Sequence, residues 1–371
     1  MNFSRIFLLN AEPICGSGLV SFYAAYVEYI SPYLFFIVSI IGSTLNIFCI
    51  IVFTRKSMIS PNNLIFAHLA IVDLATLITY MPRWANEAIR LKMYSVKEHR
   101  TYEWEIIGKY SYHVAAIFHG TSVWLAIMLA VWRYIAIVHP LKERQWCNLK
   151  TTKIFIAVGY VTTCSFGIIP FFFALEVQAF DRLLDSDGYI TWNRTIGIPT
   201  KLFLLQPVES SREITILLAL ATAVIVKILP MVLVSVYSYK CIVALQLAKN
   251  RRKKLTIRLN ESNTTNTRKN PLTDRTTRML LVILALFFTP EMPHAIFFLL
   301  VVIIGQKFDV CLSYLFEVFN DIVLVCISCN FIVYYTMSRQ FHDTFIQLFN
   351  SKPSSAQPKP ALILADREVH M

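Results

Sequence analysis

Charged residues are scarce in this chain of 371 residues: 16% are Asp, Glu, Lys or Arg, whereas 56% are hydrophobic, and the mean hydropathy is +0.55. An average soluble domain carries about 25% charged residues. One water-soluble core cannot hide so large a share of apolar side chains. We therefore expect an integral membrane protein.

The sequence also lacks the motifs of common catalytic sites. It contains no phosphate-binding loop, no nucleophile elbow and no zinc-binding spacing. The eight cysteines are scattered without the paired spacing of a metal site or a redox dithiol. They are Cys15, Cys49, Cys147, Cys164, Cys241, Cys311, Cys326 and Cys329. We predict that the protein is not an enzyme and has no metal or organic cofactor.

Seven apolar segments are long enough to cross about 30 Å of hydrocarbon as helices. They cover roughly residues 31–54, 63–83, 110–138, 152–175, 213–245, 276–304 and 312–336. In lipid such a segment must be helical unless it belongs to a closed barrel, because no water is present to bond its backbone. The sequence thus predicts an all-α membrane protein, with a seven-helix transmembrane domain over residues 31–336 and an N-terminal segment of residues 1–30.

The loops between these spans predict the orientation of the chain. The net charge is +12, and basic residues gather after the first, third and fifth spans. They include Arg55, Lys56, Lys142, Arg144, Lys150, Lys249, Arg251, Arg252, Lys253 and Lys254. The positive-inside rule then places the N-terminus outside the cell and the C-terminus in the cytoplasm of a multi-pass plasma-membrane protein. Orientation in the bilayer explains these charges better than a nucleic-acid partner does.

Two glycosylation sequons agree with this orientation, since those at Asn2 and Asn193 both fall outside. The triplets at Asn260 and Asn263 would be cytoplasmic and unused. The apolar run of residues 6–9 is too short for the core of a cleavable signal peptide. We expect the first span to serve as its own signal.

After the seventh span, an apolar stripe predicts a short amphipathic helix over residues 337–349. Phe341, Phe345, Leu348 and Phe349 recur at i, i+4, i+7 and i+8, as on a helix that lies in the membrane interface. Residues 350–371 contain the stretch KPSSAQPKP and are predicted to form a disordered cytoplasmic tail.

Short motifs in six of the spans resemble those of rhodopsin-like G-protein-coupled receptors over about residues 31–349. In chain order they are Gly42 and Asn46, Leu69-Ala70-Ile71-Val72-Asp73, Trp132-Arg133-Tyr134, Pro230, Thr277-Arg278-Met279 followed by Phe287 and Pro293, and Asn330-Phe331-Ile332-Val333-Tyr334. The longer stretches VWRYIAIVHPLKERQWC and CNFIVYYTMSRQFHDTF look like invertebrate myosuppressin and FMRFamide-type peptide receptors, and like the nematode serpentine receptors grouped with them as class W.

The resemblance implies a receptor for an extracellular peptide that signals through a heterotrimeric G protein, with arrestin as a further candidate partner. It also implies that an arginine at the cytoplasmic end of the third span is released when the sixth span swings outward. The switch residues it implies are Trp132, Arg133, Tyr134, Phe287, Pro293, Asn330 and Tyr334.

Three departures from the receptor pattern alter this expectation. Trp132 replaces the acid before the arginine, Phe331 replaces a proline, and Glu291 stands where a tryptophan is expected. Because Arg133 lacks its usual neighbouring carboxylate, we predict a receptor that is either restrained by other contacts or active without ligand. Equal basal signalling in wild type and Trp132→Asp would argue against a role for this position.

A polar core is predicted around Asp73, since an ionisable group in mid-span should face the bundle rather than lipid. The resemblance adds Asn46, Ser122 and Asn330 as its partners and Na⁺ as an allosteric ion, although Cys326 replaces an asparagine of that site. A water-linked hydrogen-bond network without an ion is the alternative.

The candidate ligand pocket consists of further polar residues in the spans: His119, Lys227, Glu291, His294, Glu317, Asn320 and Asp321. We predict that Lys227 pairs with Glu291, because leaving either charge alone in hydrocarbon is unfavourable. Glu317 and Asp321 share one helix face and suit a cationic ligand group such as a peptide arginine. A purely structural role stays open for the pair and for the histidines.

The disulfide usual in this class, from the third span to the loop after the fourth, is missing. No cysteine lies between Cys49 and Cys147 or between Cys164 and Cys241. A bridge from Cys15 to Cys311 is the alternative hypothesis, because these two fall outside. The sequence does not show whether they lie close together.

Two other functions compete with a peptide receptor. A chemosensory receptor for an environmental small molecule would use the same scaffold. A transporter is more distant, because the two halves of the chain show none of the internal repeats of transporters.

Overall fold

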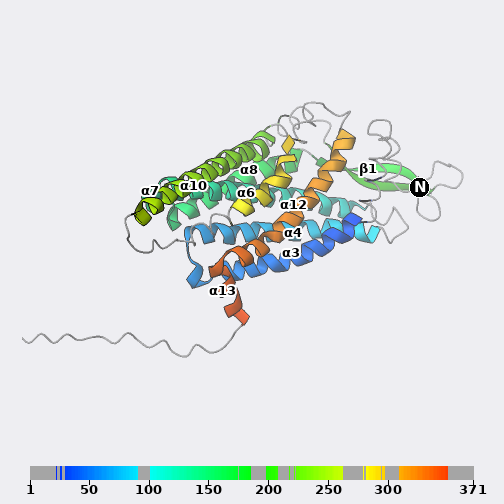
Figure 1. The fold of residues 1–371 in the computed structure, drawn as a ribbon. Helices are drawn as coiled ribbons and strands as arrows, with labels where there is room; N and C mark the ends of the chain where they lie inside the picture. The colour runs from blue at the N-terminus through cyan, green and yellow to red at the C-terminus, as the bar shows by residue number, and fades with distance from the viewer. Residues whose placement is uncertain are drawn as a thin grey trace, which may run out of the picture.

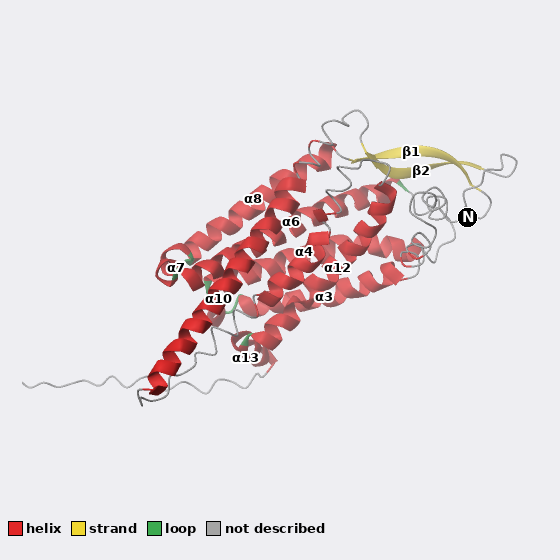
Figure 2. Cartoon of the chain, turned by 45° about the horizontal axis from the view of Figure 1, so that its top comes forward, coloured by secondary structure: helices red, strands yellow, loops and turns green. Residues whose placement is uncertain are grey.

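The computed structural model describes residues 22, 26, 30–90, 101–173, 175–184, 198–207, 217, 221, 223–261, 279, 281–293, 295–296 and 309–349. Long helices lie side by side in a bundle with a two-stranded sheet at one end (Figures 1 and 2). The long helices are α3 (Ser31–Phe53), α4 (Pro61–Arg90), α6 (Tyr102–Val138), α8 (Leu149–Phe173), α10 (Leu229–Glu261) and α12 (Asp309–Met337). The shorter ones are η2 (Lys56–Met58), α7 (Pro140–Trp146), the π-helix η4 (Ala223–Ile228), Leu281–Pro293 and α13 (Arg339–Phe349).

Six helices in the described residues are long and apolar enough to cross a membrane. The crossing segments are Ser31–Phe53, Pro61–Pro82, Tyr102–Val138, Leu149–Ile168, Val224–Leu247 and Val318–Met337, and Leu281–Pro293 is a further, shorter apolar helix. The predicted all-α membrane class is confirmed.

Several helices extend beyond the apolar windows that predicted them. α6 begins at Tyr102 rather than near residue 110, because the side chain of Thr101 accepts a hydrogen bond from the backbone N of Trp104 at 3.5 Å. Glu103 and Glu105 in the first turn also stabilise the helix, because their negative charges lie near the positive end of the helix dipole. α10 continues to Glu261, past the predicted end at 245, since Leu, Lys, Arg and Gln are good helix formers whether or not they lie in lipid.

A β-hairpin follows the fourth span and was not predicted. β1 (Leu175–Leu184) pairs antiparallel with β2 (Ile198–Pro207), with Leu175 opposite Pro207. α8 ends at Phe173, close to the predicted end near residue 175, and β1 begins at Leu175. Glu176 and Gln178 alternate with Val177 and Ala179 along β1, which is the period of a strand rather than of a helix. The hairpin contacts the start of α6.

α6 lies at the centre of the bundle and packs against α4, α8 and α10, while α3 packs against α4 and α12 (Figure 1). Side chains of α6 therefore reach most of the other spans. This central position explains why polar residues of α6 contact residues of several other helices in the site described below.

α13 lies at the end of the bundle opposite the hairpin (Figure 2). Phe341 is fully buried, with its ring centroid 5.0 Å from that of Phe53 in α3. Phe345 meets Phe48 edge-on at 5.6 Å. The predicted short helix is thus present and anchored to the bundle by its phenylalanines; its position in the membrane interface stays a prediction.

Candidate functional site

Asp73 connects three helices in the centre of the bundle. Its carboxylate is 1% exposed and accepts hydrogen bonds from Ser122 Oγ of α6 at 3.0 Å and from Asn330 Nδ2 of α12 at 2.9 Å. Burial of a carboxylate is tolerated only when such partners compensate for its lost water. Because each partner binds a different carboxylate oxygen, the side chain fixes α4 against both neighbours.

Asn46, the fourth predicted member of this core, bonds elsewhere. Its side-chain amide donates to the carbonyl of Gly42 within α3 at 2.9 Å. A hydrogen bond to the preceding turn needs no neighbouring helix. The structure therefore brings together Asp73, Ser122 and Asn330, whereas the Asn46 amide is bonded to its own helix.

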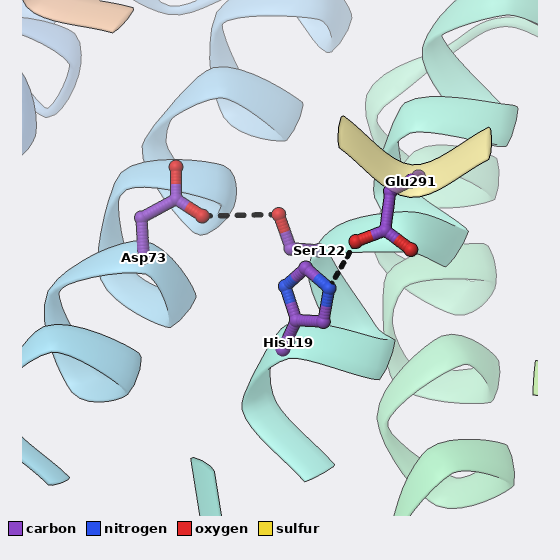
Figure 3. A network of polar contacts seen from close by, with 4 residues as sticks. All are labelled: Asp73, His119, Ser122 and Glu291. Carbon is purple, nitrogen blue, oxygen red and sulfur yellow. Dashed lines mark hydrogen bonds and ion pairs between the residues drawn. The ribbon is translucent and has the colours of Figure 1, made fainter. Parts of the chain in front are cut away.

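A second polar contact lies one turn of α6 closer to the hairpin. His119 Nε2 and Glu291 Oε1 are in hydrogen-bonding contact between α6 and the helix Leu281–Pro293, and the Glu291 side chain is 1% exposed (Figure 3). Figure 3 shows Ser122 and His119 projecting from successive turns of α6, the first toward Asp73 and the second toward Glu291. The residue that replaces the expected tryptophan is thus held by a histidine.

A narrow cavity of about 20 Å³ separates the two polar contacts. Ser122, Asn330, His119 and Glu291 line it together with apolar side chains and Cys326. A space of about 10–15 Å³ is enough for one water molecule. Asp73 does not line this cavity, and both of its carboxylate oxygens already accept hydrogen bonds. The sodium site stays a prediction.

Trp132 turns away from the arginine that follows it. Its buried indole donates through Nε1 to Thr152 Oγ1 of α8 at 3.2 Å, and its ring meets Phe155 edge-on at 5.3 Å. The residue in place of the usual acid therefore holds α6 against α8. It offers Arg133 no charge.

Arg133 lies half-buried near the end of α6. Among the described residues no carboxylate is within salt-bridge distance of it, and its buried Nε has no hydrogen-bond partner there. The carboxylate that acts on it electrostatically is Glu143 of α7. The sequence did not single out Glu143, because its half-buried position depends on how α7 packs on α6.

The two tyrosines that are predicted to be switch residues occupy different surroundings. Tyr134 meets Tyr237 of α10 edge-on at 5.8 Å, with Lys240 Nζ 5.8 Å from the Tyr134 ring centroid. Tyr334 is 1% exposed and lies 5.0 Å from both Phe53 and Phe66, and its hydroxyl has no hydrogen-bond partner among the described residues. An enclosed hydroxyl without a hydrogen-bond partner is energetically unfavourable.

Phe287 and Pro293 belong to the helix of Glu291. Phe287 lines the cavity and packs against the cluster formed by α6 and α10, and Pro293 is the last residue of the described helical segment Leu281–Pro293. Phe331, which replaces a proline, stacks on Tyr335 at 5.9 Å and meets Phe345 of α13 at 5.2 Å. Phe331 therefore contributes a ring contact between α12 and α13.

Asp321 lies apart from the cavity. The carboxylate is 2% exposed and accepts hydrogen bonds from Tyr26 Oη at 3.0 Å and Ser31 Oγ at 3.3 Å, which tie α12 to the residues at the start of α3. Asn320 beside it is half-buried. The structure thus separates Asp321 from the pair of His119 and Glu291.

The remaining predicted residues lie outside what the structure describes. They are Asn2, Cys15, Asn193 and His294, together with the side chains of Lys227, Cys311 and Glu317. The pairing of Lys227 with Glu291, the Cys15–Cys311 disulfide and both glycosylation sites stay predictions.

Comparison with known proteins identifies the family. The family model "Serpentine type 7TM GPCR chemoreceptor Srw" matches residues 33–352. The chain belongs to this family. It is a seven-transmembrane G-protein-coupled receptor and a multi-pass membrane protein, and the resemblance to class W receptors is confirmed.

Individual relatives in this receptor class are only distantly similar to the chain. Sex peptide receptor-related protein 2 of Caenorhabditis elegans is 27% identical over 319 residues, which cover 83% of this chain and 68% of the relative. Sex peptide receptor of Drosophila melanogaster is 27% identical over 337 residues, covering 86% and 72%. FMRFamide receptor of Drosophila melanogaster is 25% identical over 141 residues, covering 38% and 26%.

Proposed function

We propose that this receptor is activated by a short neuropeptide that binds at the hairpin end of the bundle, and that it signals through a heterotrimeric G protein at the α13 end. The observation that carries the proposal is the similarity over more than four-fifths of the chain, 83% and 86%, to two relatives named for sex peptide. The partial similarity to a receptor named for FMRFamide agrees with it.

The proposed orientation places the N-terminus and the hairpin outside the cell. The basic residues of the connections after the first, third and fifth spans support it. Arg133 and Tyr134 then face the G protein from the cytoplasmic end of α6, and arrestin is a further candidate at the same surface.

The proposed pocket uses the acidic residues of α12. Glu317 and Asp321 are four residues apart, so both lie on one face of the helix and attract a cationic group such as a peptide arginine. Asp321 holds Tyr26 and Ser31 in the structure. A ligand cation that binds this carboxylate would therefore compete with the start of α3 and loosen its contact with α12.

Two proposals can be tested together: that the ligand is a peptide, and that Glu317 and Asp321 bind it. The test is a peptide library applied to cells that carry a promiscuous Gα subunit and a calcium reporter. We expect responses to peptides that end in arginine-phenylalanine-amide, and we expect them to vanish in Glu317→Gln and Asp321→Asn at equal surface expression. Retained potency in both variants would refute the pocket but not the peptide.

The description of the family as chemoreceptors favours a second candidate, an environmental small molecule. The same reporter cells distinguish the two ligand classes. Responses confined to small molecules, with silence toward the whole peptide library, would overturn the neuropeptide proposal.

A further inference from the structure

One face of α8 carries an apolar stripe that is open to the surroundings of the bundle. Ile154, Val158, Val161 and Ile168 recur at i, i+4, i+7 and i+14, and their side chains are 49–66% exposed. Because α8 crosses the membrane in its segment Leu149–Ile168, this stripe faces lipid. It covers about 21 Å of helix, whereas one leaflet contains about 15 Å of hydrocarbon. An acyl chain can therefore lie along the lipid-facing stripe.

Two exposed lysines stand at the start of α8. Lys150 continues the lipid-facing stripe, four residues before Ile154, and Lys153 lies at its edge, three residues after Lys150. Side chains three apart on a helix are neighbours, and two like charges in this relation repel each other. Among the described residues, neither lysine has a carboxylate within salt-bridge distance. An anion that binds both lysines would remove the repulsion.

The helix α7 adds a third ammonium group and an aromatic ring at this end of α8 (Figure 2). Lys142 Nζ lies 5.0 Å from the ring centroid of Trp146, which is 49% exposed and stands three residues before α8 begins. Exposed tryptophans of membrane proteins gather at the level of the lipid headgroups. Residues 140–153 contain four basic side chains, all exposed, and one acidic side chain, which is half-buried. The surface at this level is therefore positively charged.

We propose that the junction of α7 and α8 binds an anionic phospholipid, with the headgroup phosphate between Lys150 and Lys153 and an acyl chain along Ile154 and Val158. The positive charge favours an anionic headgroup, and the lipid-facing stripe favours a lipid over a soluble anion. Under the proposed orientation the site lies in the cytoplasmic leaflet, which carries the anionic lipids. Binding itself depends neither on that orientation nor on the proposed peptide and G protein.

Tryptophan fluorescence of the purified full-length receptor in detergent micelles tests the site. Phosphatidylserine brominated near the start of its acyl chains should quench the emission more strongly than phosphatidylcholine brominated in the same way. The part of the signal that Trp146→Phe removes reports binding at this junction. A lysine near a membrane surface contributes a factor of about five to the binding of anionic lipid. Lys150→Gln and Lys153→Gln should each weaken phosphatidylserine binding about fivefold and leave phosphatidylcholine binding unchanged.

Lys201→Gln is the matched control, because Lys201 is an exposed lysine of β2 at the hairpin end of the bundle. It should change the binding of neither lipid. Equal quenching by the two lipids, or an unchanged phosphatidylserine curve in both lysine variants, would overturn the proposal. So would displacement of the lipid by an equal concentration of glycerophosphoserine, because the site would then take a soluble anion. Loss of G-protein activation in both lysine variants, with lipid binding intact, would assign the surface to a protein partner instead.

Discussion

Asp73 receives a hydrogen bond on each of its two carboxylate oxygens, and both donors come from helices other than its own. Hydrogen bonds to a buried charge contribute more than neutral ones, about 1.5–3 kcal/mol each. The charge is therefore a structural connector as well as a candidate ion ligand.

Removing one of these donors should destabilise the receptor measurably. We expect Ser122→Ala to lower the free energy of unfolding by about 1–3 kcal/mol, because one oxygen of Asp73 loses its partner. Ser165→Ala is the matched control: its side chain is exposed, and its one hydrogen bond among the described residues is to the Val161 carbonyl of its own helix at 2.8 Å, so the change should stay within about 0.5 kcal/mol. Thermal unfolding of the purified receptor measures both, and equal shifts would contradict the role of Ser122.

The thiol of Cys147 offers a test by pH. With its pKa raised to about 11 by burial and by Glu143, roughly one thiol in a thousand is ionised at pH 8, and only the thiolate is alkylated. Iodoacetamide should therefore label Cys147 slowly in the folded receptor, with a rate that rises about tenfold per pH unit between pH 7.5 and 9.5. Peptide mass spectrometry gives the rate, and the denatured receptor is the control. Equal labelling rates in the folded and the denatured receptor would refute the raised pKa of Cys147.

The residue types of the site could be predicted from the sequence, but not all of their partners. Asp73, Ser122 and Asn330 stand at positions that the receptor resemblance supplies, and the structure brings them together. The contact of His119 with Glu291 was not predicted, because it depends on the rotation and depth of two helices. An apolar stretch of sequence determines neither the rotation of a helix nor its depth in the bundle. Glu143 was missed for the same reason: only the docking of α7 makes it face inward.

At the scale of the helices, close packing of α3 on α12 depends on Gly42. A Cβ atom at this position would lie 2.1 Å from Ser328 Oγ and 2.9 Å from Ser328 Cβ. Because rotation of the serine side chain does not move its Cβ, α3 and α12 would have to separate. We expect Gly42→Ala to lower the unfolding temperature and surface expression. At Gly159 of α8 the nearest atom is Trp124 Cβ at 3.7 Å, an ordinary contact. Gly159→Ala should be neutral or slightly stabilising, because alanine favours the helix.

The attachment of α13 provides a second comparison within one helix. Phe341 is fully buried against α3 and α12, whereas Phe349 is 63% exposed. Phe341→Ala should reduce stability by about 3–5 kcal/mol, the usual range for a buried phenylalanine. Phe349→Ala should have a much smaller effect in detergent. Similar thermal shifts for both would show that α13 is not held by its buried face.

Helix lengths and the hairpin show what an apolar pattern leaves out at this scale. The pattern locates the membrane-crossing part of a helix, but α6 starts at a polar cap and α10 extends through polar helix formers. β1 begins directly after α8, so hydropathy averaged over a long window does not separate the strand from the helix. The capping residues locate the helix ends, and the alternation of polar and apolar residues along β1 indicates a strand.

At the scale of the whole molecule, the candidate functions of the two ends depend on the orientation of the bundle. Under the proposed orientation, the hairpin faces the ligand while Arg133, α7 and α13 face the cytoplasm. Glycosylation tests this directly, because glycans are attached on the side that becomes extracellular. In cells, Asn2→Gln and Asn193→Gln should each lower the glycosidase-sensitive mass of the receptor.

Asn260 provides the control for that experiment. Its triplet also satisfies the sequon, but it lies in the last turn of α10, on the side predicted to be cytoplasmic. Asn260→Gln should therefore leave the mass unchanged. An antibody against an N-terminal tag should stain intact cells, and one against a C-terminal tag only permeabilised cells. The opposite staining, or a glycan lost in Asn260→Gln, would show that the bundle has the opposite orientation in the membrane. Arg133 and Glu143 would then lie on the outer face, where no G protein could bind them.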